Sequence, residues 1–380
     1  MAIEIAHDQR IVMTLDAGGT FLKFSAIRSG KLLVGPISVP SEADNLDRCL
    51  RNIVEGFRSV KCILPEQPVA ISFAFPGPAD YPTGIMMNAG NLPAFRGEVP
   101  LGPILEDAFG IPVFINNDGD LFTCGEAIAG FLPYVNGLLE EAGGPKRFKN
   151  LFGLTLGTGL GGGFVREGRL WIGDNSAGGE AWLLRNRLDP SLNAEEGASI
   201  RAVRRVYARE CGIPIESAPD PKEIFEIGMG RANGRRLAAV EAFRKLGEVS
   251  GDALAQALTL IDGLAVIGGG ISAAYPLFLP AMVEAANARF EGCPSGLRRL
   301  IPWVFNLEDE AQRRDFLKGE PREIVVPGSG RIVRHDSLPR TAVGISRLGT
   351  SEAVAIGAYA LALHNLCRGD RQAAWGEAGG

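Results

Sequence analysis

Two glycine-rich turns constrain the fold of this chain more than any other feature of its sequence. The segment IVMTLDAGGTFLKFSAI begins at Ile11, and LFGLTLGTGLGGGFV begins at Leu151. Each turn joins two strand-like runs, and glycine lets backbone N–H groups approach phosphate oxygens closely because it has no Cβ. INNDGD, which begins at Ile115, lies between the two turns. This order is typical of a two-lobed enzyme that holds the phosphate chain of a nucleotide.

Strand-like and helix-like segments alternate around the first turn. Residues 45–60 repeat apolar side chains at helical spacing. Short apolar runs between turn residues predict strands over residues 11–16, 21–27, 69–75 and 112–116. The alternation of strands and helices predicts an α/β domain with a mixed sheet.

The second half of the chain repeats this organisation. Residues 151–156 and 263–267 are short apolar runs that end in glycine, and we predict both as strands. Between them, residues 231–261 carry apolar side chains at helical spacing, beginning with Leu237. The second half therefore predicts a further α/β domain.

A charged stretch that contains Gly and Pro, residues 306–347, is interpreted as an addition to this second domain. Apolar residues flank Pro327-Gly328-Ser329-Gly330 and predict a hairpin around residues 323–333. The stretch either covers a cleft or forms a subunit contact, and the sequence leaves both interpretations open.

Composition excludes several classes of partner. The chain has 380 residues, 46% hydrophobic and 22% charged, which fits two ordinary folded domains. A net charge of −5 gives little support to a nucleic-acid or anionic-membrane partner. Six cysteines without a CxxC pair are expected to be reduced thiols, and no run of 18 apolar residues occurs. We therefore expect a cytoplasmic protein with neither a membrane nor a nucleic-acid partner.

The first turn, LDAGGTFLK, supplies groups that suit a phosphate. Gly18 and Gly19 offer backbone N–H groups, Thr20 a hydroxyl, and Lys23 a positive charge if it faces the turn. Asp16 at the end of the strand suits contact with Mg²⁺ through water. A plain hairpin turn without a ligand is the alternative. No GxxxxGK[ST] is present, so the turn is not a Walker A loop.

The second turn, GTGLGGG, formally contains GxGxxG. A Rossmann dinucleotide site requires this motif to open a helix, and it would favour a dehydrogenase. Here FVREGRLWI alternates like a hairpin around Glu167-Gly168. We therefore predict a second phosphate-binding turn, with the Thr158 hydroxyl as a donor.

Asp118 follows a predicted strand and is preceded by Asn116 and Asn117. A carboxylate at a strand end can take a proton from a substrate hydroxyl as that oxygen attacks phosphorus. Its alternative role is local, as an Asx turn or helix N-cap.

Further polar and glycine-rich positions suggest ligand contacts. Glu180 and Glu195 are candidates for hydrogen bonds to sugar hydroxyls, although surface carboxylates are common. Gly268-Gly269-Gly270 follows an apolar strand and permits close approach of an adenine or ribose, or forms a simple strand-to-helix turn.

Taken together and in this order, these segments resemble the ROK family of bacterial sugar kinases and sugar-responsive repressors, within the actin-like ATPase superfamily. The resemblance covers about residues 11–363 and rests on five motifs, LDAGGTFLK, FPGPAD with NAGNLPAF, INNDGD, TLGTGLGGG and VIGGG. It implies an α/β, two-domain actin-like (ribonuclease H-like) fold with a mixed sheet in each lobe. Residues 1–117 with a C-terminal helix at about 351–365 would form the small lobe, and 118–350 the large one, with ATP and sugar in the cleft between them.

The resemblance also implies a role for each matching residue. Asp118 matches the catalytic base, and the sugar contacts match Gly77, Asn91, Asn117, Glu180 and Glu195. The phosphate and adenosine positions match Gly18, Gly19, Thr20, Lys23, Thr158, Gly159, Gly269 and Gly270.

Two departures from the family pattern bear on function. Leu183 stands where family kinases usually have histidine, and RNRLDPSLNAE replaces their cysteine-rich zinc loop. We therefore predict no structural zinc and a rearranged sugar pocket, which makes the identity of the sugar uncertain. Family repressors carry an N-terminal helix-turn-helix, but ten residues precede the first predicted strand here. DNA binding is therefore disfavoured.

The implied activity is ATP- and Mg²⁺-dependent phosphorylation of a hexose, expected at the 6-hydroxyl of glucose or a close relative. The alternative is a non-catalytic sugar sensor without a DNA-binding domain, which the lost histidine and zinc loop favour. The resemblance also makes a homodimer plausible.

Overall fold

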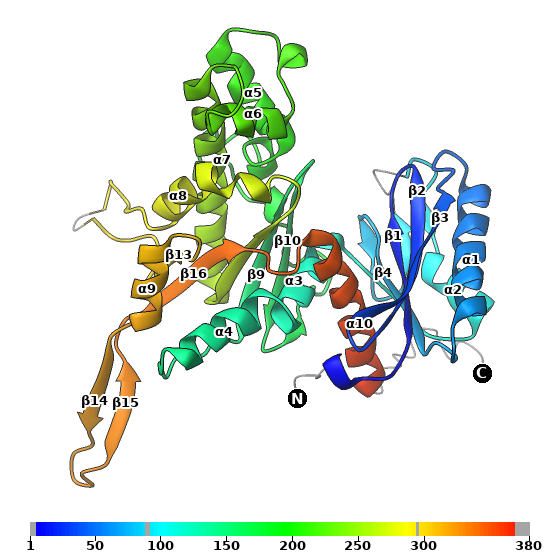
Figure 1. The fold of residues 1–380 in the computed structure, drawn as a ribbon, viewed down its shortest axis with the longest axis horizontal. Helices are drawn as coiled ribbons and strands as arrows, with labels where there is room; N and C mark the ends of the chain where they lie inside the picture. The colour runs from blue at the N-terminus through cyan, green and yellow to red at the C-terminus, as the bar shows by residue number, and fades with distance from the viewer. Residues whose placement is uncertain (1–4, 88–91, 294–295, 369–380) are drawn as a thin grey trace. The chain divides into compact units, whose positions relative to one another are not determined.

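The computed structural model describes residues 5–87, 92–293 and 296–368, shown in Figure 1. The chain folds into two compact units. Unit 1 comprises Met1–Ala129, Gly168–Gly178 and Ser351–Gly380, and unit 2 comprises Gly130–Glu167 and Gly179–Thr350. Within the described ranges, no helix combines the length and apolar character needed to cross a bilayer.

Unit 1 is built on a five-stranded mixed sheet with the order β3-β2-β1-β4-β8. β1 pairs antiparallel with β2 and parallel with β4, and β4 pairs parallel with β8. The carboxyl ends of β1, β4 and β8 therefore lie at the same edge. The strands are β1 (Val12–Ala17), β2 (Phe21–Arg28), β3 (Lys31–Pro40), β4 (Ala70–Ala74) and β8 (Val113–Asn116).

The helix predicted over residues 45–60 is α1 (Leu46–Ile63), which begins after its N-cap Asn45. Phe57 of α1 packs edge-on against Phe24 of β2, with ring centroids 5.0 Å apart. Both rings are fully buried, so α1 closes the core of unit 1. The remaining elements are η1 (Ile5–His7), β5 (Ala79–Asp80), β6 (Ile85–Met87), β7 (Glu98–Val99), α2 (Leu101–Phe109), α3 (Asp118–Ile128), β11 (Arg169–Leu170) and α10 (Thr350–Arg368).

Two helices of unit 1 approach closely through glycine. A Cβ on Gly125 of α3 would lie 2.0 Å from the carbonyl oxygen of Ala353 in α10. A Cβ on Gly357 of α10 would lie 1.9 Å from the carbonyl oxygen of Leu121 in α3. Because no side chain fits at either position, the two glycines fix the distance between α10 and the helix that starts at Asp118.

Unit 2 contains a second mixed sheet, whose strands lie in the order β10-β9-β12-β16-β13. β9 and β10 form an antiparallel hairpin, whereas β12 runs parallel to both β9 and β16. The strands are β9 (Asn150–Leu156), β10 (Leu160–Arg166), β12 (Leu264–Gly268), β13 (Trp303–Asn306) and β16 (Arg340–Ile345). The mixed α/β class predicted from the alternation of elements is confirmed in both units.

The long helical pattern is α7 (Arg236–Ile261), which packs against α8 (Tyr275–Ala286). Phe243 and Phe278 are fully buried at this packing, whereas Leu237 at the start of α7 is 86% exposed. The other helices of unit 2 are α4 (Phe131–Glu141), η2 (Ala181–Leu183), η3 (Ala194–Glu196), α5 (Ile200–Cys211), η4 (Ile215–Ser217), α6 (Pro221–Gly228), η5 (Ser272–Ala274) and α9 (Glu310–Lys318).

The hairpin predicted in the insertion is confirmed. β14 (Pro321–Val325) and β15 (Ile332–Asp336) form a two-stranded antiparallel ribbon, which we call the arm. The arm leaves unit 2 between α9 and β16 and extends beyond both of them (Figure 1).

Candidate active site

The carboxyl edge of the sheet in unit 1 gathers the predicted polar residues of that unit. Asp16 of β1 is in register with Ala74 of β4, and Ala74 with Asn116 of β8. The chain continues from Ala74 to Gly77 and from Asn116 to Asp118. Ligands of open α/β sheets bind at the carboxyl ends of parallel strands, so these ends mark the candidate site in unit 1.

Asp118 is the first residue of α3, and the N-cap is its neighbour Asn117. The backbone N–H of Gly119 donates to the side-chain oxygens of both Asn117 and Asp118, each at 2.8 Å. The local role considered for Asp118, that of N-cap, is therefore filled by Asn117. Within the part of the chain that the structure describes, the second carboxylate oxygen of Asp118 accepts no hydrogen bond.

The Asp118 carboxylate has the properties of a base. Its side chain is exposed to solvent. Enough protein nevertheless surrounds the carboxylate that desolvation raises its pKa, while the N–H of Gly119 acts in the opposite direction. A raised pKa makes the carboxylate a stronger proton acceptor than an ordinary aspartate.

The first glycine-rich turn joins β1 to β2. The N–H of Gly18 donates to the carbonyl of Phe21 at 3.1 Å, and the Ser41 hydroxyl donates to the carbonyl of Gly19 at 2.5 Å. Thr20 is exposed beside them. The turn is thus held from both sides, and its tip faces solvent.

Asp16 and Lys23 lie opposite each other across the same turn. They are cross-strand neighbours, and the Lys23 Nζ is 3.9 Å from the Asp16 Oδ2. Both side chains are more than half exposed, so the pair leaves the Asp16 carboxylate open to water. An exposed carboxylate beside a phosphate turn fits Mg²⁺, which keeps most of its waters and binds through one or two carboxylates plus phosphate oxygens. Among the described residues, no three His, Cys, Asp or Glu are grouped to enclose a metal ion.

Gly77 lies after β4, under an aromatic side chain. A Cβ on Gly77 would lie 2.9 Å from the Tyr81 hydroxyl, and that hydroxyl donates to the carbonyl of Phe75 at 3.1 Å. A side chain at this position would displace the Tyr81 hydroxyl, so glycine fits this close approach. Asn91, the other predicted sugar contact of this region, lies outside the described residues.

The second glycine-rich turn is also a hairpin turn. β10 begins at Leu160, directly after Gly159, and pairs antiparallel with β9. The GxGxxG match therefore opens a strand and not a helix, and a Rossmann dinucleotide site at this motif is wrong. The carbonyl of Gly157 accepts from the N–H of Ile200 at 2.8 Å, and Thr158 is exposed at the tip.

The third glycine-rich segment lies next to this turn. Because β12 runs parallel to β9, its last residue Gly268 is in register with Thr155. Gly269 has φ +88°, and a Cβ there would lie 2.3 Å from the carbonyl oxygen of Leu156. A Cβ on Gly270 would meet nothing within 4 Å. Unit 2 therefore brings Gly269 and Gly270 beside the turn of Thr158.

Glu195 contacts the second turn directly. Its Oε2 accepts from the N–H of Leu160 at 3.1 Å, and its Oε1 lies 3.5 Å from the guanidinium of Arg201. A Cβ on Gly159 would lie 2.6 Å from the same Oε2. The predicted sugar-binding carboxylate is thus positioned by the predicted phosphate-binding turn.

Glu180 is positioned by β10. The segment before it lies on the glycines of that strand, since a Cβ on Gly162 would lie 2.3 Å from the carbonyl oxygen of Gly179. The indole Nε1 of Trp182 donates to the Glu180 carboxylate. Leu183, at the position of the usual family histidine, is 60% exposed.

Hydrogen bonds close the loop that replaces the expected zinc loop. The buried Asn186 accepts from the N–H of Leu188 at 2.9 Å, and its own N–H donates to the carbonyl of Leu192 at 3.0 Å. Arg185 and Asn193 form an antiparallel bridge at the base of the loop. The loop therefore runs from Glu180 to Glu195 with a closed backbone.

Unit 1 thus brings together Asp16, the first turn, Gly77, Asn117 and Asp118. Unit 2 brings together Thr158, Gly159, Glu180, Glu195, Gly269 and Gly270. Sequence reasoning missed the residues that orient these groups, namely Trp182, Asn186 and Arg201. Only Arg201 left a signal, because it follows Ser199, a good N-cap, in the first turn of a helical pattern.

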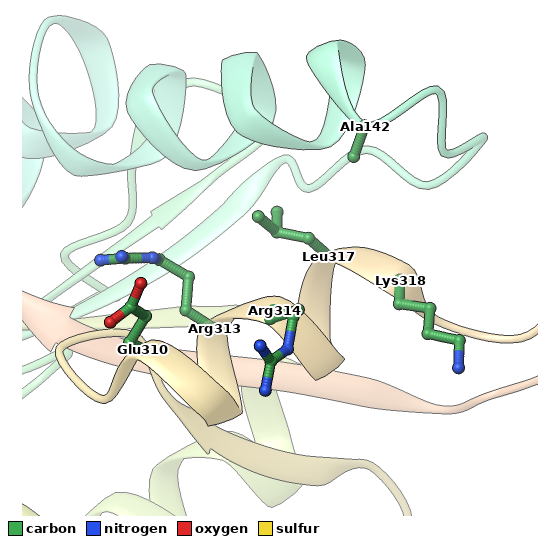
Figure 2. A pocket seen from close by; sticks show the side chains of 6 residues that line it. All are labelled: Ala142, Glu310, Arg313, Arg314, Leu317 and Lys318. Atoms are coloured by element: carbon green, nitrogen blue, oxygen red, sulfur yellow. The ribbon is translucent and has the colours of Figure 1, made fainter.

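A separate cavity of about 370 Å³ lies between the end of α4 and α9 in unit 2. Figure 2 shows that the side chains that line it come mainly from α9. They are Ala142, Glu310, Arg313, Arg314, Leu317 and Lys318. None of the predicted site residues lines this cavity, so it is not the candidate active site.

Comparisons with known proteins agree with this geometry. A family model described as ROK family matches residues 12–295. The crystal structure of glucokinase from Parabacteroides distasonis is 52% identical with a TM-score of 0.88, covering 95% of this chain and 99% of that one. An N-acetyl-D-glucosamine kinase from Vibrio parahaemolyticus is 27% identical over 68% of this chain and 83% of the relative.

A third comparison bears on the fold. The ROK family glucokinase from Streptomyces griseus, solved with glucose and AMPPNP, has a TM-score of 0.59 at 20% identity, covering 92% of this chain and 98% of that one. The structural likeness confirms the predicted two-domain actin-like class with mixed sheets.

Proposed function

Because the chain belongs to the ROK family and is an ATP-using sugar kinase of that family, we propose that Asp118 deprotonates a hexose hydroxyl that attacks the γ-phosphate of ATP. The sugar is glucose or a close relative, and the attacking group is its 6-hydroxyl. The similarity to the glucokinase of Parabacteroides distasonis supports this choice. The position of Asp118 carries the proposal, since it lies at the carboxyl edge of the sheet with one carboxylate oxygen uncommitted.

In the proposed mechanism, proton transfer is the task of unit 1. The attacking oxygen loses its proton to the Asp118 carboxylate as its bond to phosphorus forms, and the bond from phosphorus to the ADP oxygen breaks. Asn117 caps α3 and so keeps Asp118 fixed at the start of the helix. Lys23 and the N–H groups of the first turn balance the charge of phosphate oxygens. Mg²⁺, held through water by Asp16, would add further positive charge there.

Unit 2 supplies carboxylates for sugar recognition in this proposal. Glu180 and Glu195 accept hydrogen bonds from sugar hydroxyls, because an ionised carboxylate is a strong, acceptor-only group. Trp182 and Arg201 hold the two carboxylates in place. Thr158 and Gly159 bind phosphate oxygens, and Gly269 and Gly270 leave room for adenosine.

The loop between Glu180 and Glu195 favours a second candidate function. It contains no histidine or cysteine, and Leu183 points an exposed apolar side chain where a polar group is usual in the family. A sugar-sensing protein that binds a hexose without phosphorylating it would also fit such a loop.

Because the net charge of the chain is acidic, we propose that the protein acts in the cytoplasm without a nucleic-acid partner.

A sugar panel separates these functions. ADP release from MgATP is measured with glucose, mannose, fructose, N-acetylglucosamine and N-acetylmannosamine, and the phosphorylated product is identified by ³¹P NMR. The kinase proposal predicts sugar-dependent ADP release and a 6-phosphate. Calorimetric sugar binding by folded protein, without ADP release for any sugar, would instead establish the sensor.

A further inference from the structure

Three parallel strands of unit 2 end at the same edge of its sheet. β12 runs parallel to both β9 and β16. The second glycine-rich turn follows β9, and Gly269 and Gly270 follow β12. Residues 346–350 follow β16 and lead into α10. Because ligands of open α/β sheets bind at the carboxyl ends of parallel strands, this third segment lies at the edge that carries the glycines assigned to adenosine.

Hydrogen bonds tie the segment after β16 to β12 at both of its ends. At the first end, the N–H of Ser346 donates to the carbonyl of Ile267 at 2.9 Å. At the second end, the hydroxyl oxygen of Thr350 accepts from the N–H of Gly269 at 2.8 Å. Between them, Gly349 has φ +81°, and its N–H donates to the Ser346 hydroxyl at 2.8 Å. The segment is thus a closed turn that ends with a side chain on the glycine segment.

The hydrogen bond from Gly269 to Thr350 completes the fixation of an unusual backbone. Gly269 has φ +88°, and a Cβ there would lie 2.3 Å from the carbonyl oxygen of Leu156. Its own carbonyl accepts from the N–H of Ser272, the first residue of η5, at 3.0 Å. The Thr350 hydroxyl adds an acceptor for the N–H of Gly269. It therefore holds the peptide bond that precedes Gly269, next to the open position of Gly270.

Thr350 is also the first residue of α10. A threonine at the start of a helix commonly accepts from an N–H of its own helix. This hydroxyl accepts instead from a residue that is 81 positions away in the chain. Thr350 is the last residue of unit 2, and α10 continues into unit 1, where Gly357 packs against Leu121 of α3. One side chain thus links the glycine segment to the start of the helix that packs on α3.

We propose that Thr350 is a positioning residue for the nucleotide, because its hydroxyl holds Gly269 and Gly270 in the geometry that binds adenosine. The inference rests on the proposed role of these two glycines. Without the hydroxyl, the N–H of Gly269 loses its acceptor, and nucleotide binding must order the turn again. This cost falls on nucleotide binding and not on sugar binding, since Glu180 and Glu195 are held by other side chains.

Calorimetric titration of the full chain with Mg²⁺ and AMPPNP tests the proposal. Thr350→Val removes the hydroxyl and keeps the branched shape, whereas Thr350→Ser keeps the hydroxyl. The matched control is Thr259→Val, which removes a hydroxyl that donates to the carbonyl of Ala255 within α7 at 2.7 Å. We expect Thr350→Val to bind AMPPNP about 3- to 10-fold more weakly than wild type, the effect of one lost hydrogen bond. Thr350→Ser and the control should bind AMPPNP like wild type, and glucose affinity without nucleotide should be equal in all of these proteins.

The possible outcomes separate this inference from the proposed function. Equal AMPPNP affinity of Thr350→Val and wild type would overturn the positioning role and leave the nucleotide site in place. A loss that Thr350→Ser does not restore, or an equal loss of glucose affinity, would assign the effect to the fold and would also overturn that role. A wild-type protein that binds glucose but no AMPPNP would refute the proposed nucleotide site, and the inference with it.

Hydrogen exchange of the wild-type protein removes any dependence on how the variants fold. With AMPPNP bound, amides of residues 346–350 should exchange more slowly, together with those of residues 268–271, because the nucleotide stabilises the hydrogen bonds that join the two segments. The arm extends beyond β16 (Figure 1), and its amides should not change. Slower exchange in residues 268–271 without any change in residues 346–350 would show that the segment after β16 has no part in nucleotide binding.

Discussion

The carboxylate of Glu195, a predicted sugar contact, also contacts the second glycine-rich turn, which is predicted to bind phosphate. It accepts from the N–H of Leu160 and lies against Gly159, although 35 residues separate it from Leu160. No local pattern predicts such a contact, because it depends on how the loop after η2 returns to β10. The identity of Glu195 as a candidate could be predicted from the sequence, but its link to the second turn could not.

Substitution of Gly159 tests this link. In Gly159→Ala, the new Cβ would lie 2.6 Å from the Glu195 Oε2 and displace the carboxylate. Loss of one charge-assisted hydrogen bond costs about 1.5 to 3 kcal/mol, so sugar affinity should fall about 10-fold or more. Isothermal titration calorimetry with sugar and no nucleotide measures this effect.

The matched control is Gly157→Ala. Its Cβ would meet nothing within 4 Å, and neither glycine has a positive φ that alanine would strain. Sugar affinity of this variant should equal that of wild type. Equal losses in the two variants, or no loss in Gly159→Ala, would show that Glu195 does not depend on the turn.

Asp118 should determine the acid limb of the pH profile. Only its ionised form can accept a proton, and desolvation raises its pKa above the ordinary value of 3.8. As pH falls through the raised pKa, kcat/KM should decrease in proportion to the ionised fraction. Sugar affinity measured by calorimetry over the same range should stay constant. If sugar affinity fell over the same pH range as kcat/KM, the titrating group would act in sugar recognition and not as the base.

Among the elements, the loop of residues 185–193 is closed by hydrogen bonds, where family kinases usually have a cysteine-rich zinc loop. The sequence of this loop contains no cysteine or histidine and therefore predicts that the loop holds no zinc. It does not show how the loop is closed instead. Asn186 is one of many asparagines in the chain, and its role depends on its burial and on the N–H of Leu188, which donates to its side-chain oxygen.

Truncation of Asn186 should destabilise this element. Asn186→Ala removes the buried side-chain oxygen that accepts from the N–H of Leu188, and loss of this hydrogen bond costs about 0.5 to 1.5 kcal/mol in the free energy of unfolding. Asp189→Ala is the control, because Asp189 accepts from Ser191 in the same loop but is exposed, and exposed changes usually cost within about 0.5 kcal/mol. Thermal unfolding measures both variants.

Treatment with a chelator tests the prediction that the loop needs no metal. Dialysis of the wild-type protein against EDTA should leave its Tm unchanged, because the loop contains no cysteine or histidine and hydrogen bonds close it. Addition of zinc afterwards should also have no effect on the Tm. A Tm that falls with EDTA and returns with zinc would contradict the prediction.

For some strands and turns, the residue pattern of the sequence is sufficient to predict the structure. Both glycine-rich turns join antiparallel strands, as the strand-like runs on either side of each turn predict. The second one is shorter than expected, because β10 starts at Leu160 and uses glycines 161–163 as strand residues. The segment before Glu180 explains the glycine at position 162, because a Cβ there would lie 2.3 Å from the carbonyl oxygen of Gly179. A strand built of glycine has no apolar pattern, so its start could not be predicted.

At the scale of the whole molecule, each unit has its own sheet and its own share of the candidate residues. The carboxyl edge in unit 1 follows from parallel strand order, which the strand–helix alternation predicts. The residues that support the site, such as Trp182 and Arg201, depend on tertiary packing and have no sequence motif. The division of the chain at residue 117 stays a prediction.

Measuring both the turnover and the sugar affinity of Asp118→Asn tests the central claim, that Asp118 is the base of a sugar kinase. Asparagine keeps the oxygen that accepts from the N–H of Gly119, so the start of α3 should be preserved. We expect sugar affinity by calorimetry to be unchanged and sugar-dependent ADP release to fall by about 100- to 10,000-fold, the usual contribution of a general base. A variant that binds sugar and still turns over at a near wild-type rate would contradict the assignment of Asp118.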